Sequence, residues 1–101
     1  LRFILTKNKK NYNNNFEIIS NKKHLNVSEI NDILFEKNIQ SIIIEGGKKT
    51  LETFINSDCW DEARVIVSEN KLKSGTTSPV LNSKLNKEII IDGDSIQFYF
   101  N

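Results

Sequence analysis

Short apolar runs with two different periods divide this chain into expected helices and strands. β-branched and aromatic runs predict strands, whereas apolar residues three and four positions apart predict helices. One helix is expected to begin after Ser28 as its N-cap and to end at Asn38, which suits a left-handed cap. A second helix is expected to end near Ser57. The strands expected from the pattern cover residues 1–6, 16–20, 42–44, 62–68, 88–91 and 95–100.

The stretch from Ile42 to Ile55 changes its pattern twice within a few residues. It opens with three consecutive isoleucines, a run typical of a strand buried on both faces of a parallel sheet. Glu45 and two glycines follow, and then Leu51, Phe54 and Ile55 take up a helical spacing. The pattern therefore predicts a buried strand, a tight turn and a helix.

This turn has the residues of an anion site. The N-terminus of a helix carries unpaired backbone N–H groups and the positive end of the helix dipole. Gly46 and Gly47 would let an anion approach the backbone closely, and Lys48 and Lys49 add positive charge. A phosphate or pyrophosphate is the natural occupant. The alternative is that the glycines only form the turn and the lysines are solvated, and the motif alone leaves both interpretations open.

The end of the chain predicts a β-hairpin. Asp92-Gly93 lies between two apolar runs, a strong signal for a two-residue turn. We expect this hairpin at the edge of an otherwise parallel sheet. The expected order is strand, strand, helix, strand, helix, strand and hairpin, which is an α/β fold.

Composition narrows the class of protein. A chain of 101 residues is one domain or less, and its formal net charge of +1 gives no electrostatic case for nucleic acid or an anionic membrane. No apolar run approaches the roughly 18 residues of a membrane span. The single cysteine, Cys59, excludes an internal disulfide and suits a reducing cytosol. With one histidine and one cysteine, no tetrahedral zinc site is expected unless carboxylates complete it.

The single histidine, cysteine and tryptophan are expected to have structural roles. His24 lies among lysines and is expected on the surface, not as a catalytic base. Cys59 and Trp60 are expected to pack against the end of the second helix. Because Leu1 already lies inside an apolar run, the chain is expected to be part of a longer protein.

Two motifs carry a resemblance to a known family. Ile42–Gly47 with Leu51, and Trp60-Asp61-Glu62-Ala63-Arg64-Val65 after Phe54-Ile55, resemble the C-terminal reductase domain of the bifunctional riboflavin-biosynthesis deaminase/reductase. Gly75 and Pro79 also fit this family. The resemblance implies a dihydrofolate reductase-like fold, a three-layer α/β/α arrangement whose mostly parallel sheet ends in an antiparallel C-terminal hairpin. Residues 1–101 would be the C-terminal portion of the reductase domain, without the deaminase half and its zinc signature.

The resemblance also implies an activity. It is the reduction by NADPH of 5-amino-6-(5-phosphoribosylamino)uracil to the ribitylamino product in riboflavin biosynthesis, although this portion alone is not expected to turn over substrate. Glu45 would hydrogen-bond the substrate, and Lys7 and Lys48 would pair with the 2′-phosphate of NADPH. No catalytic side chain is implied, because the hydride chemistry belongs to the cofactor. The implied cofactor-binding residues are Thr6, Lys7, Gly46, Gly47, Lys48, Lys49, Thr50, Leu51, Glu52 and Thr53.

The implied partners are a small pyrimidine substrate and a second copy of the chain in a homodimer, in the cytoplasm. Two alternatives remain at this stage. One is another dihydrofolate reductase-like enzyme with a different pterin or pyrimidine substrate. The other is a non-catalytic α/β module in which the glycines serve only the turn and the hairpin edge serves self-association.

Overall fold

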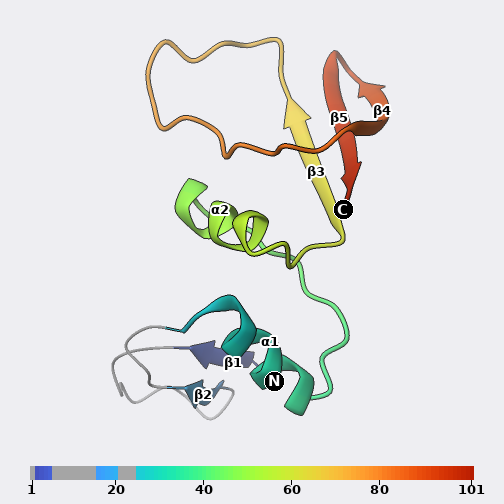
Figure 1. Ribbon diagram of the computed structural model, residues 1–101. Coiled ribbons are helices and arrows are strands. Elements are labelled where there is room, and N and C mark those ends of the chain that lie inside the picture. Colours follow the sequence, from blue (N-terminus) through green and yellow to red (C-terminus); the bar gives the residue numbers. More distant parts are fainter. Residues whose placement is uncertain (1, 6–15, 21–24) are drawn as a thin grey trace. The chain divides into compact units, whose positions relative to one another are not determined.

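A computed structural model describes residues 2–5, 16–20 and 25–101 (Figure 1). The chain divides into two compact units, residues 1–42 and residues 43–101. In the first unit, strands β1 (Arg2–Leu5) and β2 (Phe16–Ser20) form a parallel pair in which Arg2 lies opposite Phe16. Both strands were predicted from their apolar runs and are confirmed.

Helix α1 (Val27–Glu36) completes the described part of the first unit. Its N-cap is Asn26, two residues before the predicted Ser28. The Asn26 side-chain oxygen accepts a hydrogen bond from the Glu29 N–H at 2.8 Å, and the Glu29 carboxylate accepts one from the Asn26 N–H at 3.1 Å. This reciprocal capping box satisfies the N–H groups of Asn26 and Glu29. At the other end, Asn38 has the predicted left-handed conformation, with a φ of 57°.

The predicted strand at residues 42–44 is not formed. The structure assigns these residues to no helix or strand, and the side chain of Ile43 is 87% exposed. A strand buried on both faces needs a neighbouring strand on each edge to take its backbone hydrogen bonds. In the described part of the chain, β1 and β2 pair with each other and the remaining strands form a separate sheet, so none flanks this run.

The second unit contains helix α2 (Lys48–Asn56) and strands β3 (Glu62–Val67), β4 (Leu85–Ile91) and β5 (Asp94–Phe100). The helix and the three strands were all predicted. The predicted turn at Asp92 and Gly93 joins β4 to β5, and positive φ angles of 51° and 91° match a type I′ turn. β4 begins three residues before the predicted position, and its register with β5 shifts between Leu85 and Lys87.

The predicted three-layer α/β/α fold with a mostly parallel sheet is wrong. The three strands of the second unit form an antiparallel sheet in the order β3-β5-β4, and parallel pairing is confined to β1 and β2 among the described strands. The last strand therefore lies in the middle of its sheet, not at the edge. The prediction failed because it needed residues 42–44 as a central parallel strand.

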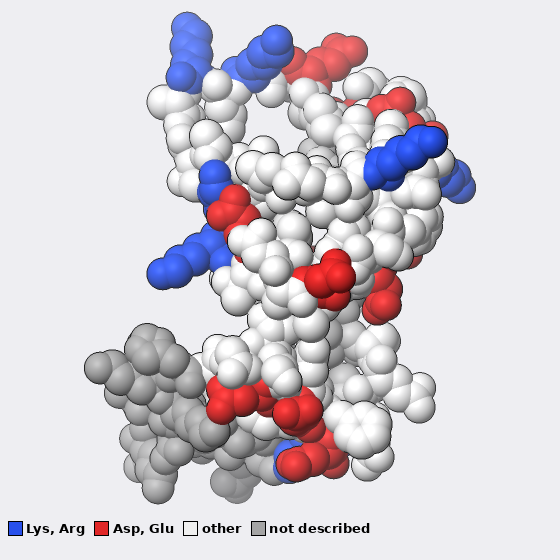
Figure 2. Space-filling view, viewed as in Figure 1, with Lys and Arg blue, Asp and Glu red and all other residues white. Residues whose placement is uncertain are grey.

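Few described side chains are fully removed from solvent. Two apolar ones are buried, Val27 at 5% exposure on α1 and Phe54 at 8% on α2. Leu51 and Ile55 are half-buried beside Phe54, which confirms the predicted apolar face of α2. On the face of the second unit shown in Figure 2, described positive and negative side chains are interspersed and form no large patch of one sign.

Candidate functional site

The start of α2 lacks the caps that complete α1. Gly47 is the N-cap, and its carbonyl accepts hydrogen bonds from the N–H groups of Thr50 at 3.0 Å and Leu51 at 3.3 Å. Glycine has no side chain to cap the first amides, and the first turn holds no acidic residue. The positive end of this helix is therefore left uncompensated by its own residues.

The two glycines leave this corner open to solvent. Both are exposed. A Cβ atom on Gly47 would meet no heavy atom within 4 Å, and one on Gly46 would lie 3.4 Å from the Thr50 Cβ, an ordinary contact. No heavy atom therefore crowds either glycine.

Lys48 is engaged elsewhere. Its Nζ donates a hydrogen bond to Thr77 Oγ1 at 2.7 Å and lies 3.6 Å from the carboxylate of Glu52. Because Glu52 is one turn further along α2, the Lys48 side chain runs toward the C-terminal end of the helix and away from the first amides. Thr77 belongs to the loop between β3 and β4. An anion at the start of α2 would therefore have to draw Lys48 away from two partners, whereas Lys49 is exposed.

The other predicted residues do not all gather at the helix start. Leu51 lies on the apolar face with Phe54, and the Thr53 hydroxyl donates to the Lys49 carbonyl at 2.8 Å. Successive helix residues are turned by about 100°, so four in a row cannot face one ligand. The structure brings together the exposed residues Glu45, Gly46, Gly47, Lys49 and Thr50.

Thr6 and Lys7, predicted on the adenosine side of the cofactor, lie outside the described residues. Their part in the site stays a prediction. The chemistry of the described part of this turn is that of backbone amides and lysine charge.

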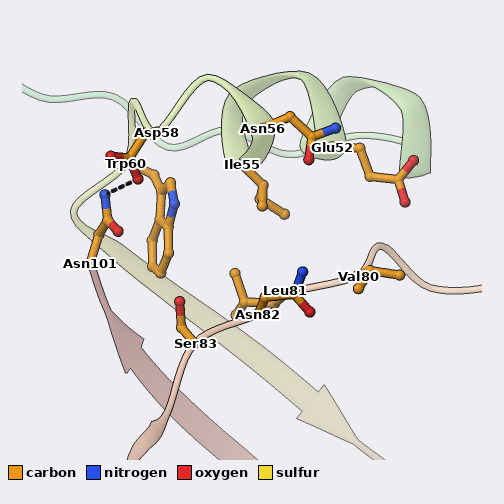
Figure 3. A pocket seen from close by; sticks show the side chains of 10 residues that line it. All are labelled: Glu52, Ile55, Asn56, Asp58, Trp60, Val80, Leu81, Asn82, Ser83 and Asn101. Carbon is orange, nitrogen blue, oxygen red and sulfur yellow. Dashed lines mark hydrogen bonds between the residues drawn. The ribbon is translucent and has the colours of Figure 1, made fainter.

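A cavity of about 270 Å³ lies between α2 and the extended segment before β4 (Figure 3). The Trp60 side chain forms one of its walls, so its expected packing against the helix end is only partial. At this end, the Asn101 side-chain amide donates to the Asp58 carboxylate at 2.9 Å. The residues that line the cavity are Glu52, Ile55, Asn56, Asp58, Trp60, Val80, Leu81, Asn82, Ser83 and Asn101.

Sequence reasoning missed this cavity. Its walls come from α2 and its C-terminal turn, from residues 80–83 and from the last residue, and no periodicity links three such segments. The one local signal was the pair of polar residues around the end of α2, Asn56 and Asp58, beside the single tryptophan.

Cys59 is exposed, contrary to the expectation that it packs against α2, and its Sγ lies 3.3 Å from the Ser57 carbonyl oxygen. Among the described residues, no three His, Cys, Asp or Glu side chains are placed to hold a metal ion together. Within the same residues, neither helix has the length and apolar character needed to cross a membrane.

Two observations bear on function: the two sequence motifs at residues 42–51 and 60–65, and the uncapped start of α2. No protein-family model, curated protein or solved structure matches this chain.

Proposed function

We propose that the start of α2 binds the pyrophosphate of NADPH, and that the chain serves the reduction of 5-amino-6-(5-phosphoribosylamino)uracil to its ribitylamino product. The observation that carries the binding proposal is the uncapped helix start, where exposed glycines precede two lysines and no acid lies in the first turn. The choice of reaction depends on the resemblance of the two sequence motifs to the reductase family. It does not depend on the predicted mostly parallel sheet, since the strands of the second unit pair antiparallel.

An anion is the ligand that this helix start favours. Its unpaired N–H groups can donate to phosphate oxygens, and the helix dipole adds an attraction of roughly 0.3–1 kcal/mol for a charge at its N-terminus. Lys49 is exposed beside these amides. Lys48 would contribute after exchanging Thr77 and Glu52 for a phosphate. Its hydrogen bond to Thr77 is exposed, and its ion pair with Glu52 is half-buried with a separation of 3.6 Å.

The remaining roles belong to the same proposal. Glu45, immediately before the glycines, accepts hydrogen bonds from the pyrimidine substrate. Lys48 selects the 2′-phosphate of NADPH. The reduced nicotinamide supplies the hydride, so the chain positions its ligands and needs no nucleophile of its own. The proposed location is the cytoplasm.

A second candidate function is self-association without catalysis. One observation favours it: the antiparallel sheet leaves large apolar side chains in solvent, including Ile66 at 70% exposure and Ile90 at 64%. In this alternative the glycines serve only the turn before α2. The homodimer itself is compatible with both candidates.

Backbone amide shifts in NMR spectra test the binding proposal. Titration with inorganic pyrophosphate and then with NADPH should shift the amides of residues 46–49 saturably, because these are the groups that would donate to the anion. Absence of such shifts with both ligands would contradict the site, and the alternative without catalysis would then be favoured.

Variants test the role of the lysines. Lys48→Ala should weaken NADPH binding several-fold and leave NADH binding nearly unchanged, while Lys49→Ala should weaken both because it would act on the pyrophosphate. Lys71→Ala, in the loop between β3 and β4, is the matched control for loss of one positive charge. Equal losses for both cofactors in Lys48→Ala would refute the 2′-phosphate role. NADPH oxidation that depends on the phosphoribosylamino-pyrimidine, in the full-length protein, tests the reaction.

A further inference from the structure

We propose that the outer edge of β3 pairs antiparallel with β3 of a second copy of this chain, with Glu62 of each copy opposite Arg64 of the other. The pairing would join the three-stranded sheets of the two copies into one continuous sheet. This inference rests on the proposed self-association, whose surface and register it names, and it is independent of NADPH binding.

The two edges of the sheet differ in how well they are protected. The β4 edge carries the exposed Lys87 and a register shift between Leu85 and Lys87, and both features hinder pairing with a further strand. β3 pairs with β5 without a register shift over its six residues, and it contains neither lysine nor proline. Ile66 and Val67 on β3 are 70% and 43% exposed. Among the described strands none lies on the outer side of β3, so this regular and apolar edge can be extended.

The hydrogen-bond pattern shows which backbone groups of β3 are available. The Asn101 N–H donates to the Asp61 carbonyl at 3.1 Å, so these residues form a hydrogen-bonded pair of the antiparallel ladder. Such pairs alternate, and every second residue counted from Asp61 therefore bonds to β5. The residues between them direct their N–H and C=O groups to the outer edge; they are Glu62, Arg64 and Ile66.

The charges of β3 select the register. In a symmetric antiparallel pair, directly opposite residues share a face, so the possible registers differ in steps of two residues. Glu62 and Arg64 are the charged residues of β3 and lie on one face. With Ala63 at the two-fold axis, each Glu62 lies opposite Arg64 of the other copy. With Arg64 at the axis two like charges would meet, and with Val65 at the axis neither charge would meet an opposite one, so the first register is favoured.

The charged side chains are placed to reach a second copy. The Arg64 side chain is 67% exposed and that of Glu62 is 34% exposed. Within one copy the Arg64 guanidinium donates to the Glu62 carboxylate and lies 5.4 Å from the centre of the Phe98 ring. A guanidinium has five N–H donors and a carboxylate accepts several hydrogen bonds, so both can bind a second partner. The four charges of a dimer would then alternate in sign across the axis.

Cross-linking tests the register. In this register Ala63 faces Ala63 of the second copy in a non-hydrogen-bonded pair, whose Cα atoms lie about 4.5 Å apart, within the range of a disulfide. In a Cys59→Ser background, Ala63→Cys should form a disulfide-linked dimer with copper phenanthroline as oxidant, seen on a non-reducing gel. Val65→Cys, on the same face of β3, is the matched control, and it should stay largely unlinked in the time that Ala63→Cys needs for half conversion.

Charge exchange tests the ion pairs. Arg64→Glu or Glu62→Arg alone places like charges opposite each other twice and should weaken the dimer at least about five-fold in sedimentation equilibrium. An equimolar mixture of these two variants restores both attractive pairs and should dimerise about as tightly as the unsubstituted chain. Lys71→Glu and Glu69→Arg, two positions apart in the exposed loop after β3, make the same changes of charge. Their mixture is the matched control and should dimerise no more tightly than either variant alone.

Two kinds of failure are distinguishable. An unsubstituted chain that stays monomeric at all concentrations would overturn the inference together with the proposed self-association. A dimer in which Val65→Cys cross-links as fast as Ala63→Cys, or in which mixing the charge variants restores nothing, would overturn the edge pairing alone. Amides of Glu62, Arg64 and Ile66 protected from hydrogen exchange in a monomer would also overturn it, because another segment would already cover the edge. Far-UV circular dichroism identifies variants that fail to fold, and the cysteine variants decide the outcome if a charge variant unfolds.

Discussion

Asn26 is the N-cap of α1 and Gly47 is the N-cap of α2. The first amides of α1 are capped by side chains, whereas those of α2 are not. Asn26 and Glu29 close the start of α1 with their own side chains. Gly47 has no side chain that could accept hydrogen bonds from the first amides of α2, so these amides remain available to a ligand. Of the two starts, the one after Gly47 is therefore suited to bind an anion.

Glu88 gives the sheet a pH dependence at the scale of a single residue. Its carboxylate accepts hydrogen bonds from the Ser95 hydroxyl and from the Gln97 amide at 3.2 Å, across the β4–β5 pair. These bonds favour the charged form and lower the pKa of Glu88 below its ordinary value of 4.5, chiefly through Ser95. A lowered pKa in the folded state means that the stabilisation is present above pH 4.5 and is lost as the pH falls through the lowered value.

We therefore expect Glu88→Gln to flatten the acid limb of a plot of Tm against pH, below pH 4.5. Thermal unfolding followed by circular dichroism measures this. Glu69→Gln, in the loop after β3, removes one negative charge without these hydrogen bonds and should retain the acid limb. An acid limb identical in Glu88→Gln and the unsubstituted chain would show that the hydrogen bonds do not persist in solution.

At the scale of the element, the β4–β5 hairpin joins the central strand of the second unit to one of its neighbours. Asp92 and Gly93 take left-handed φ angles that match the twist of the flanking strands, and the pairing runs from Ile91 opposite Asp94 to Leu85 opposite Tyr99. Because β5 is the central strand, an error in this turn would disturb both of its neighbours.

Gly93→Ala should destabilise the chain by about 1–2 kcal/mol, because alanine in a left-handed conformation brings its Cβ too close to the following carbonyl oxygen. Chemical denaturation measures the loss. Gly93→Asn is the matched control: asparagine tolerates this conformation, so its loss should be clearly smaller. Equal losses in the two variants would argue against a type I′ turn.

At the scale of the whole molecule, the sheet of the second unit presents apolar side chains to solvent. Ile66 lies opposite Ile96, which lies opposite Ile89, so the three form one row across the sheet. Ile66 is 70% exposed at the β3 edge of this row. Exposed apolar surface of this kind is typical of an interaction face.

We expect the chain to associate with a second copy through this row. Sedimentation equilibrium should detect a dimer whose population rises with concentration, and Ile66→Ser should shift the equilibrium toward the monomer. Leu72→Ser is the matched control, since Leu72 is 90% exposed but lies in the loop between β3 and β4. A monomer at all concentrations, or equal effects of the two substitutions, would refute association through the sheet.

Features that are fixed by neighbouring residues were predicted correctly, whereas features that need contacts far apart in the sequence were not. The helix around Phe54 and the turn at Gly93 were predicted correctly, since neighbouring residues decide them. The strand at residues 42–44 was not, because a strand exists only where other strands pair with it. Likewise, Lys48 was expected at a phosphate, yet a threonine 29 positions away holds its side chain.

By itself, the sequence determined both helices, the strands β1 to β5, the left-handed cap at Asn38 and the hairpin turn. All of these depend on backbone preferences and on side chains within a few positions. Only the tertiary structure decided the antiparallel order β3-β5-β4, the exposure of Ile43 and the cavity beside Trp60. These features depend on which distant segments meet, and the periods of apolar residues carry no information about the choice of partner.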